Sequence, residues 1–280
     1  MKLTPLSLAV TFTAALTVSA ASADDDIKAV ATAAMKAMFV DFDAAATTGL
    51  LAEDYIQHNP AVPTGAAPII GFLPALKDSG IQLTTHRLIA EGDLVVAHNL
   101  YENAQAFGGD TLVAFDVFRI ENGQLAEHWD NLAPLAGPNP SGRTQLDGPT
   151  DITDLDKTAA NKALVTGFVE TILMNGEVER ITDFISTETY LQHNTGIADG
   201  LDGLGAALGA MAEQGISMVY SDLHIVVAEG NFVFTASEGT LGDAPTAFFD
   251  LFRVKEGKIV EHWDIVASIP DQMAHDNGKF

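Results

Sequence analysis

The pattern of apolar and polar residues changes in the same way within each half of the chain. Apolar residues recur at helical spacing through DDIKAVATAAMKAMFVDF (residues 25–42) and through DKTAANKALVTGFVETIL (residues 156–173). A second short helix and a third, Gly-rich helix are expected next, the latter over residues 201–214 in the second half. The period then becomes strand-like, with turns at Gly92-Asp93, Asn122-Gly123, Gly230-Asn231 and Glu256-Gly257. Helices followed by an antiparallel sheet predict an α+β fold.

The second half of the chain repeats the first. FDVFRIENGQLAEHWD (residues 115–130) returns as FDLFRVKEGKIVEHWD (249–264), and YIQHN (55–59) returns as YLQHN (190–194). The spacing is far longer than a solenoid repeat, so each copy is a whole domain. A Pro- and Gly-rich stretch separates the copies and is expected to be a linker. The predicted organisation is a signal peptide at 1–23, domain one at 24–135, the linker at 136–154, domain two at 155–270 and a tail at 271–280.

The turn of the final hairpin decides which side chains share a face. Glu256 is a poor residue for the positive φ of a tight two-residue turn, so a three-residue loop is expected in both copies. In that register Asp116 lies opposite His128, and Asp250 opposite His262. Side chains alternate along strands. One face of the sheet is therefore predicted to carry Asp116, Phe118, His128 and Asp130, and the other Arg119, Glu127 and Trp129.

The first residues have the order of a secretory signal peptide. Lys2 precedes an apolar stretch that ends in Ala21-Ser22-Ala23, so cleavage is expected before Asp24. The alternative is an uncleaved membrane anchor, for which the apolar run is short. The mature protein is expected to be periplasmic or secreted, with no membrane association after cleavage.

Composition narrows the classes of partner and chemistry. The formal net charge is −24, which opposes binding to nucleic acid and to anionic membranes. The absence of cysteine excludes disulfides, thiol catalysis and thiolate metal sites. There is no Gly-rich phosphate loop and no Gly-x-Ser-x-Gly motif, so neither a nucleotide cofactor nor a serine hydrolase has support. No cofactor is predicted.

These motifs together resemble the SnoaL-like polyketide cyclase family, in the branch described as predicted SnoaL-like aldol-condensation enzymes. The residues that carry the resemblance are YIQHNP with its following Gly, HRLIAEGD, and the FDVFR and EHWD ends of the last hairpin. It covers roughly residues 27–135 and 155–270. The resemblance implies two tandem cone-shaped domains of the nuclear transport factor 2-like fold. Each would have N-terminal helices packed on a curved antiparallel sheet. It implies less about the reaction, because this fold hosts isomerases, dehydratases, cyclases and binding proteins.

The resemblance also implies roles for particular carboxylates. In the cyclases a carboxylate at the end of the last strand acts as acid and base on a substrate carbon, and Asp130 and Asp264 match it. Some cyclases have His on the preceding strand, where this chain has Asp116 and Asp250. This departure leaves the proton relay open.

The shared face combines two carboxylates and an imidazole among apolar neighbours. Burial and mutual charge can poise such groups for general acid–base catalysis. An aldol cyclisation or a double-bond shift needs a base and a donor that supports the enolate. The candidates for the donor are His58 or His86 in the first copy and His193 or His224 in the second. The candidate catalytic residues are Asp130, His128, Asp116, His86 and His58 in domain one and Asp264, His262, Asp250, His224 and His193 in domain two. The candidate substrate-binding residues are Tyr55, His98, Phe118, Asn131, Tyr190 and Phe252.

Other interpretations remain open at this point. The His128-Trp129-Asp130 segment could simply close the sheet edge, and His58 could line a cavity or support a loop. His128 and Asp130 could face one metal ion, but no recognised ligand spacing is present and no metal is predicted. The favoured function is a cofactor-independent acid/base enzyme of the aldol cyclase, isomerase or dehydratase type. Its ligand would be a small, largely apolar carbonyl compound. The alternatives are a non-catalytic binder of hydrophobic small molecules and a pure interaction module.

Two expectations concern how the copies differ and meet. Domains of this fold commonly pair through the face that carries Trp129 and Trp263, so an intrachain pseudo-dimer is expected. His98 is matched by Ala236, and Asn131 by Ile265. These changes predict a drier second domain, with any chemistry in domain one. A two-residue turn at Gly92-Asp93 would place His98 on the side of Arg87 instead of His86.

Overall fold

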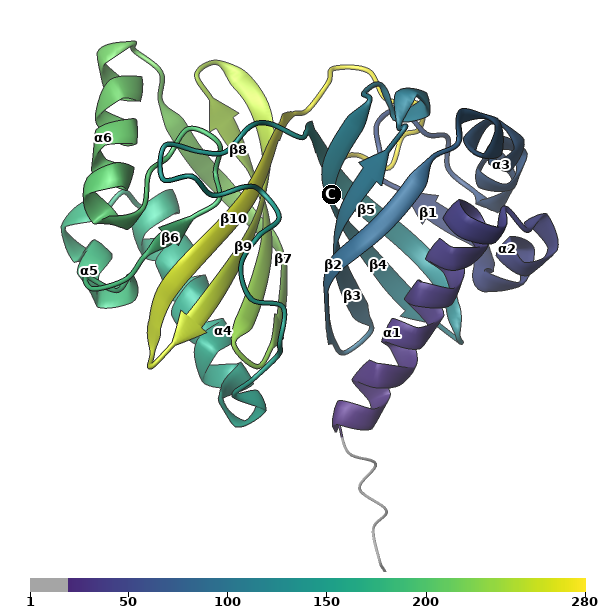
Figure 1. Ribbon diagram of the computed structural model, residues 1–280, viewed down its shortest axis with the longest axis horizontal. Helices are drawn as coiled ribbons and strands as arrows, with labels where there is room; N and C mark the ends of the chain where they lie inside the picture. Colours follow the sequence, from purple (N-terminus) through teal and green to yellow (C-terminus); the bar gives the residue numbers. More distant parts are fainter. Residues whose placement is uncertain (1–19) are drawn as a thin grey trace, which may run out of the picture.

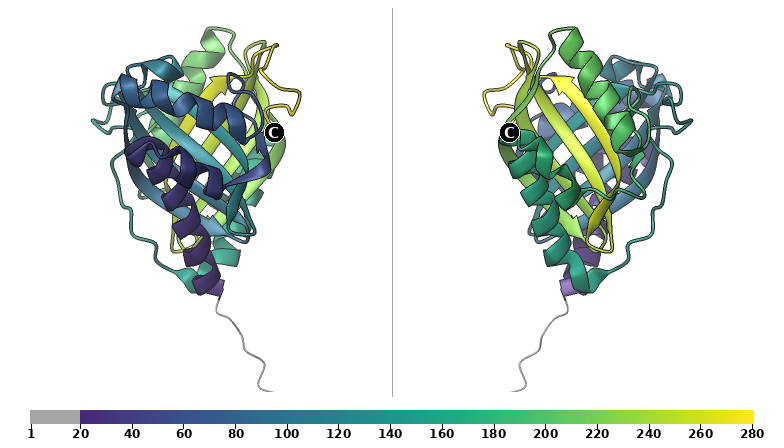
Figure 2. Two further views of the ribbon diagram at one scale, coloured as in Figure 1. Left: turned by 90° about the vertical axis from the view of Figure 1, so that its right-hand side faces the viewer. Right: turned by 90° about the vertical axis from the view of Figure 1, so that its left-hand side faces the viewer.

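Two domains of one architecture make up the described part of the protein. The computed structural model describes residues 20–280, so most of the predicted signal peptide lies outside the described residues. Two curved sheets face each other at the centre of Figure 1, and the helices lie on the two outer sides. The side views in Figure 2 show these helices in front of the sheet of their own domain. Within the described range, no helix is long and apolar enough to cross a membrane.

The elements of the two domains follow the same order. The helical elements of domain one are α1 (Ala20–Lys36), η1 (Ala37–Asp41), α2 (Ala44–Leu50), α3 (Ala66–Ser79) and η2 (Gln105–Phe107). Its strands are β1 (Leu51–Gln57), β2 (Gln82–Glu91), β3 (Leu94–Glu102), β4 (Thr111–Glu121) and β5 (Gln124–Pro134). The helical elements of domain two are η3 (Leu155–Lys157), α4 (Thr158–Phe168), η4 (Val169–Met174), η5 (Val178–Arg180), α5 (Ile181–Phe184) and α6 (Gly200–Glu213). Its strands are β6 (Leu191–Gln192), β7 (Met218–Glu229), β8 (Phe232–Leu241), β9 (Ala244–Lys255) and β10 (Lys258–Ser268).

The predicted opening helix is present in each domain, as α1 with η1 and as α4 with η4. In domain one the apolar stripe of α1 and η1 packs into the core through Ala31, Met35 and Met38. The helix stops at Phe42, whose φ of 51° is left-handed. Asp43 then caps α2, because its Oδ1 accepts hydrogen bonds from the backbone N–H groups two and three residues later, at 2.9 and 3.0 Å.

Each sheet is mixed instead of purely antiparallel. The strand orders are β1-β5-β4-β3-β2 and β6-β10-β9-β8-β7, and β1 and β6 run parallel to the last strand of their domain. The other neighbours are antiparallel, as predicted. The parallel strand arises because the Tyr-x-Gln-His-Asn motif is not in a hairpin. It joins the free edge of β5 or β10 before the chain returns through α3 or α6, and parallel strands need such a crossover.

The turn of the final hairpin differs from the prediction. Glu121 pairs with Gln124, and Asn122 and Gly123 have φ of 52° and 77°, so the loop has two residues. In domain two Glu256 accepts the same conformation, with φ of 53°. The left-handed conformation costs Glu about 1–2 kcal/mol, but this turn matches the twist of the strands.

The corrected register places Asp116 opposite Asp130 and Phe118 opposite His128. It differs from the predicted register by two residues. A shift of two leaves every side chain on the predicted face, because the side-chain period of a strand is two. We call the face of Asp116, His128 and Asp130 the cone face, because the helices of the same domain cover it. We call the opposite face, with Trp129, the partner face.

The partner faces of the two sheets pack against each other. One apolar cluster combines Phe115 and Trp129 of domain one with Phe234, Phe249 and Trp263 of domain two. The rings of Phe115 and Phe234 are 5.4 Å apart, and the two Trp side chains are 9% and 1% exposed. This packing agrees with the expected pairing of the two domains within one chain.

The linker and the tail each cross to the opposite domain. In the linker, Asn139 Nδ2 donates to the backbone oxygen of Gln192 of domain two at 2.6 Å. In the tail, Asn277 Nδ2 donates to the backbone oxygen of Gln57 of domain one at 2.9 Å. Figure 1 shows the yellow tail passing from β10 to the end of the β5 sheet. We call these segments the linker strap (136–147) and the tail strap (271–280).

Separated domains are expected to self-associate. Domain one (24–135) or domain two (155–270) expressed alone would expose an apolar partner face with a large aromatic patch. Size-exclusion chromatography with light scattering should show dimers or larger species of each half, compared with the intact chain. Monodisperse monomers with solvent-exposed Trp fluorescence would contradict the burial of Trp129 and Trp263 at a stabilising interface.

Candidate active site

A cavity of about 710 Å³ lies inside the cone of domain one. This volume is typical of sites for small organic molecules. Most of its wall is apolar and comes from η1, α3, η2 and the sheet, including Met38, Phe39, Ile69, Phe72, Leu76, Phe107, Phe118 and Leu132. The polar side chains of the wall are Tyr55, Gln57, Asn59, Tyr101, Asp116, His128 and Asp130. The cavity therefore combines an apolar wall with polar groups gathered on one side.

The hydrogen-bond partners of His128 show that its Nδ1 carries a proton. Gln57 Oε1 accepts hydrogen bonds from the backbone N–H groups of His58 and Asn59 at 2.9 and 2.8 Å, which fixes this atom as the amide oxygen. His128 Nδ1 lies 3.0 Å from the same oxygen and must therefore donate a proton to it. His128 Nε2 faces Asp116 Oδ1 at 3.1 Å. The remaining proton lies between the imidazole and Asp116.

Asp116 is held by donors that match its strand neighbours. Asn99 Nδ2 and the Tyr101 hydroxyl donate to its Oδ2 at 2.7 and 3.1 Å. Both come from alternate positions of β3, so they share the cone face. Burial, followed by the charge of Asp116, raises the pKa of the Tyr101 hydroxyl well above its usual 10. Tyr101 therefore remains a donor at neutral pH, and Asp116 is fully used in this network.

Asp130 differs from Asp116 because one of its oxygens is free. Asn59 Nδ2 donates to its Oδ2 at 2.6 Å. Its Oδ1 is buried and has no hydrogen-bond partner, although the side chain lines the cavity and is 5% exposed. An unpaired buried carboxylate oxygen costs free energy. Asp130 thus lines the cavity with a carboxylate of which one oxygen accepts no hydrogen bond.

Domain two keeps the charged groups but not the space. His262 Nε2 lies 2.9 Å from Asp250 Oδ1, and Asn194 Nδ2 donates to Asp264 Oδ2 at 2.7 Å. The cavity that Asp264 lines has a volume of about 130 Å³, and neither His262 nor Asp250 lines it. This cavity also touches Ala133 of domain one and Gln145 of the linker strap, so it lies at the boundary of the domains, and it is much smaller than a drug-sized ligand requires.

Two larger side chains fill the second cone. Phe248 stands at the position of Ala114, and Phe168 at the position of Ala34. Phe248 is fully buried and stacks on Tyr220 with ring centroids 4.2 Å apart. Gly239 replaces Tyr101, and the hydroxyl near Asp250 comes instead from Tyr220 at 3.3 Å. The space that forms the cavity in domain one is therefore occupied by aromatic side chains in domain two.

The His262 imidazole is expected to titrate above its usual pKa of 6.5. Burial by itself would lower the pKa, but the hydrogen bond to Asp250 and the charges of Asp264 and Asp250 raise it. A raised pKa gives stability that is fully present below pH 6.5 and is lost as the pH rises through the folded-state value. An NMR titration of the His262 ring protons should show this, and Asp250→Asn should lower the pKa. The exposed Asp222→Asn serves as control, and an unchanged His262 in Asp250→Asn would contradict the ion pair.

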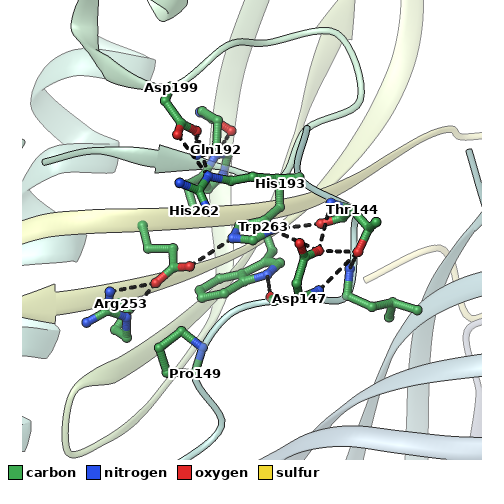
Figure 3. A network of polar contacts seen from close by, with 12 residues as sticks. Thr144, Asp147, Pro149, Gln192, His193, Asp199, Arg253, His262 and Trp263 are labelled. Atoms are coloured by element: carbon green, nitrogen blue, oxygen red, sulfur yellow. Dashed lines mark hydrogen bonds and ion pairs between the residues drawn. The ribbon is translucent and has the colours of Figure 1, made fainter. Parts of the chain in front are cut away.

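Two predicted catalytic residues lie on the opposite face. His58 Nε2 contacts Glu127 at 2.9 Å and its ring stacks on Trp129 at 4.9 Å. His193 stacks on Trp263 at 4.5 Å and its Nδ1 donates to the backbone oxygen of Thr144 in the linker strap. Figure 3 shows this arrangement around Trp263. The prediction of a cavity role for either His is wrong, because the residue before each points its amide into the cone and successive side chains of a strand alternate.

The remaining His and Asn candidates also miss the cavity. His98 pairs with Arg87 across the two-residue Gly92-Asp93 turn and accepts a hydrogen bond from it at 3.1 Å on the partner face. Asn131 is also on that face, where its Nδ2 donates to the backbone of Ala247 and Ile265. Both residues lie on the partner face, and Asn131 joins the domains, so the prediction that they bind substrate is wrong.

His86 and His224 lie in irregular parts of the first long hairpins. His86 occupies a β-bulge, and its Nε2 is buried without a partner outside the cavity lining. His224 contacts Glu238 and stacks on Phe280. Neither reaches the cone, because a bulge adds a residue and shifts the alternation of faces.

The other candidates lie on the cone side of their own domain, and five site residues were not predicted. Tyr55 and Phe118 line the cavity, Phe118 stacks on His128, and Phe252 stacks on His262. Tyr190 accepts a hydrogen bond from Gln192 in domain two. The site residues that were not predicted are Gln57, Asn59, Asn99, Tyr101 and Lys279. The alternation of β3 could have indicated Asn99 and Tyr101, whereas nothing in the pattern indicates Lys279.

The site was also tested against a metal ion. Ligand atoms of Asp116, His128 and Asp130 lie within 4.8 Å of one another, and the same holds for their counterparts in domain two. In domain one, however, both oxygens of Asp116 and both nitrogens of His128 are already in hydrogen bonds. Lys279 Nζ lies 3.7 Å from Asp130 Oδ1. A cation would have to displace a cation and break this network, so the donor set does not fit one.

The fold and the site define a SnoaL-like protein. The sequence profile of the SnoaL-like domain matches the chain twice, over residues 31–128 and 165–262. The chain belongs to this family and contains two tandem domains of it. No curated protein matches the chain.

Solved structures resemble single domains of this protein. TsrD from Streptomyces laurentii is 22% identical, with 39% of this chain and 88% of that chain covered and a TM-score of 0.33. A candidate ketosteroid isomerase from Kribbella flavida DSM 17836 is 21% identical, with 46% and 92% covered and a TM-score of 0.35. An LEH-like epoxide hydrolase from M. tuberculosis is 14% identical, with 40% and 85% covered and a TM-score of 0.34. Similarity at this level does not transfer an activity.

Proposed function

We propose that domain one is a cofactor-independent acid/base enzyme of the aldol cyclase, isomerase or dehydratase type. Its substrate would be a small, largely apolar carbonyl compound. The observation that supports this most is the free, buried Oδ1 of Asp130 beside a largely apolar cavity of about 710 Å³. A carboxylate in such a place can take a proton from carbon, because water does not compete for it.

The proposed roles follow from the hydrogen bonds. Asn59 holds Oδ2 of Asp130, which leaves Oδ1 to remove a proton from the carbon next to the carbonyl. The Tyr55 hydroxyl lines the same cavity, and burial followed by the charges of Asp130 and Asp116 raises its pKa well above 10. Tyr55 therefore stays protonated and can donate to the enolate oxygen.

A non-catalytic binder of the same ligands is the second candidate. The apolar wall supports it, since Met38, Phe39, Ile69 and Phe72 provide contact area without chemistry. The two proposals share the cavity and differ only in whether Asp130 moves a proton.

Deuterium exchange distinguishes the two functions. A panel of cyclic ketones and enones would be incubated with the protein in D₂O, and NMR would follow binding and loss of the α-proton signals. An enzyme should bind some members and exchange their α-protons, and Asp130→Asn should retain binding but lose exchange. Binding without exchange would favour the binder. Failure of every member to bind would contradict both proposals.

We also propose that the protein is exported. The support is the sequence order of Lys2, the apolar stretch and the small residues before Asp24. N-terminal sequencing of the protein from the periplasm or medium should begin at Asp24. Uncleaved protein recovered in the membrane pellet would refute the proposal.

A further inference from the structure

The tail strap brings a buried lysine to the catalytic carboxylate of domain one. Lys279 is 8% exposed, and its Nζ donates a hydrogen bond to the backbone oxygen of Asp130. The same Nζ lies 3.7 Å from Asp130 Oδ1, the atom without a hydrogen-bond partner. Its other near neighbour is the ring of Phe249, at 5.6 Å. A buried ammonium is costly unless an opposite charge faces it, and Asp130 supplies that charge.

The strap is fixed on both sides of Lys279. His58 Nδ1 donates to the backbone oxygen of Gly278 at 3.0 Å. Phe280 stacks on His224 of domain two with ring centroids 4.2 Å apart. Further back, His275 Nε2 donates to the backbone oxygen of Asn59 at 2.9 Å. Lys279 is thus held between the two domains, and His58 has a role in placing the strap.

Domain two has a matching strap bond, but the residue that follows it is uncharged. His193 Nδ1 donates to the backbone oxygen of Thr144 at 2.7 Å, which matches the bond from His58 to Gly278. The next residue of the linker strap is Gln145, which is buried and follows Thr144 as Lys279 follows Gly278. Gln145 lines the small cavity with Asp264. The two straps make matching bonds, but only the tail strap places a cation beside the carboxylate of the cone, because Arg143 of the linker strap pairs with Asp199.

We propose that Lys279 is a positioning residue for domain one, whose ammonium keeps Asp130 ionised as the base, so that the active site is completed by the segment that follows domain two. The inference rests on the proposed acid/base role of Asp130. The physical reason is that an opposite charge within about 4–6 Å favours the ionised form of a carboxyl group. Lys279 is placed to supply this charge, because its Nζ lies 3.7 Å from Asp130 Oδ1.

The other groups that face Asp130 do not supply a fixed cation. They are Asn59 after β1, Tyr55 of β1, Asp116 of β4 and His128 of β5. Asn59 is neutral, Tyr55 stays protonated, and His128 is engaged with Asp116. Burial lowers the pKa of Lys279, although Asp130 raises it. Lys279 therefore loses its charge at a lower pH than an exposed lysine.

The test measures the ionisation of Asp130 directly in the full chain. Carboxyl ¹³C NMR would give the Asp130 pKa in the wild type, Lys279→Met and Lys279→Arg. We expect Lys279→Met to raise it by about one unit or more and Lys279→Arg to keep it near the wild-type value. Gln145→Met, the matched change in the other strap, should leave it unchanged. An unchanged Asp130 pKa in folded Lys279→Met would overturn the proposal.

A second variant decides the matter if Lys279→Met does not fold. Gln145→Lys places a cation beside Asp264, whose pKa is raised by burial and by the charge of Asp250. This variant should lower the Asp264 pKa, and no change would overturn the proposal. These titrations need no substrate. A shift without any deuterium exchange would uphold the role of Lys279 in ionisation while the enzymatic proposal failed.

Discussion

Replacing Asp130 by Asn is expected to reduce α-proton exchange by about a hundredfold or more, the usual contribution of a general base. Asn has nearly the same shape and can still bond to Asn59, so binding and folding should change little. The amide cannot take the proton, because its nitrogen and oxygen are not basic at neutral pH. The rate would be measured by loss of the α-proton NMR signal at saturating ligand.

Asp264→Asn is the matched control and should leave most of the rate. Asp264 has the same partner in Asn194, but it lines a cavity of about 130 Å³ that is too small for the proposed ligand. Equal losses in the two variants, or the reverse order, would show that domain two carries the chemistry. The sequence analysis expected the same order from His98 and Asn131, but that reason is wrong, because both residues lie on the partner face.

Replacing Phe248 by Ala is expected to destabilise the protein by roughly 3–5 kcal/mol and to open the second cone. Phe248 is fully buried and packs on Tyr220, so its removal leaves a cavity beside Asp250. Denaturant unfolding followed by Trp fluorescence and far-UV circular dichroism would measure the loss. Phe72→Ala is the control, since Phe72 is 37% exposed and should cost far less.

The same variant should change ligand stoichiometry. An apolar ligand that binds one site per chain in the wild type is expected to find a second site in Phe248→Ala, as seen by isothermal titration calorimetry. A loss below about 1 kcal/mol together with unchanged stoichiometry would mean that Phe248 is not what closes the second cone.

The sequence predicted which face of the sheet a residue occupies more accurately than which residues pair across strands. Asp116, His128 and Asp130 meet on one face as expected, because an error of two residues does not change the face. The predicted three-residue loop was wrong, because Glu256 adopts a left-handed conformation that its side chain disfavours. The placement of His86 was also wrong, because no feature of the sequence pattern marks the bulge in which it lies. The predicted face of a strand residue is thus correct when the register is wrong by two residues, and it is wrong where a bulge inserts one residue.

The difference between the two cones could have been read from the aligned repeats. Ala114 and Phe248 occupy the same place in the repeated segment, and the change from methyl to aromatic ring points to a filled cone. Lys279 could not have been found in this way. Its importance depends on where a segment without regular structure crosses to another domain, and such a path is fixed by tertiary packing instead of local pattern.

The reciprocal straps also set the order in which the protein can mature during its synthesis. Domain one leaves the ribosome first, and domains generally fold as they emerge. Its Tyr-x-Gln-His-Asn motif nevertheless remains without the bonds to His275, Asn277 and Gly278 until the tail strap has been made and domain two has docked. The linker strap, which binds domain two, precedes that domain in the chain and has already been translated when domain two folds. The first domain to fold is therefore the last to become complete, and a nascent chain with domain one alone lacks the lysine beside Asp130.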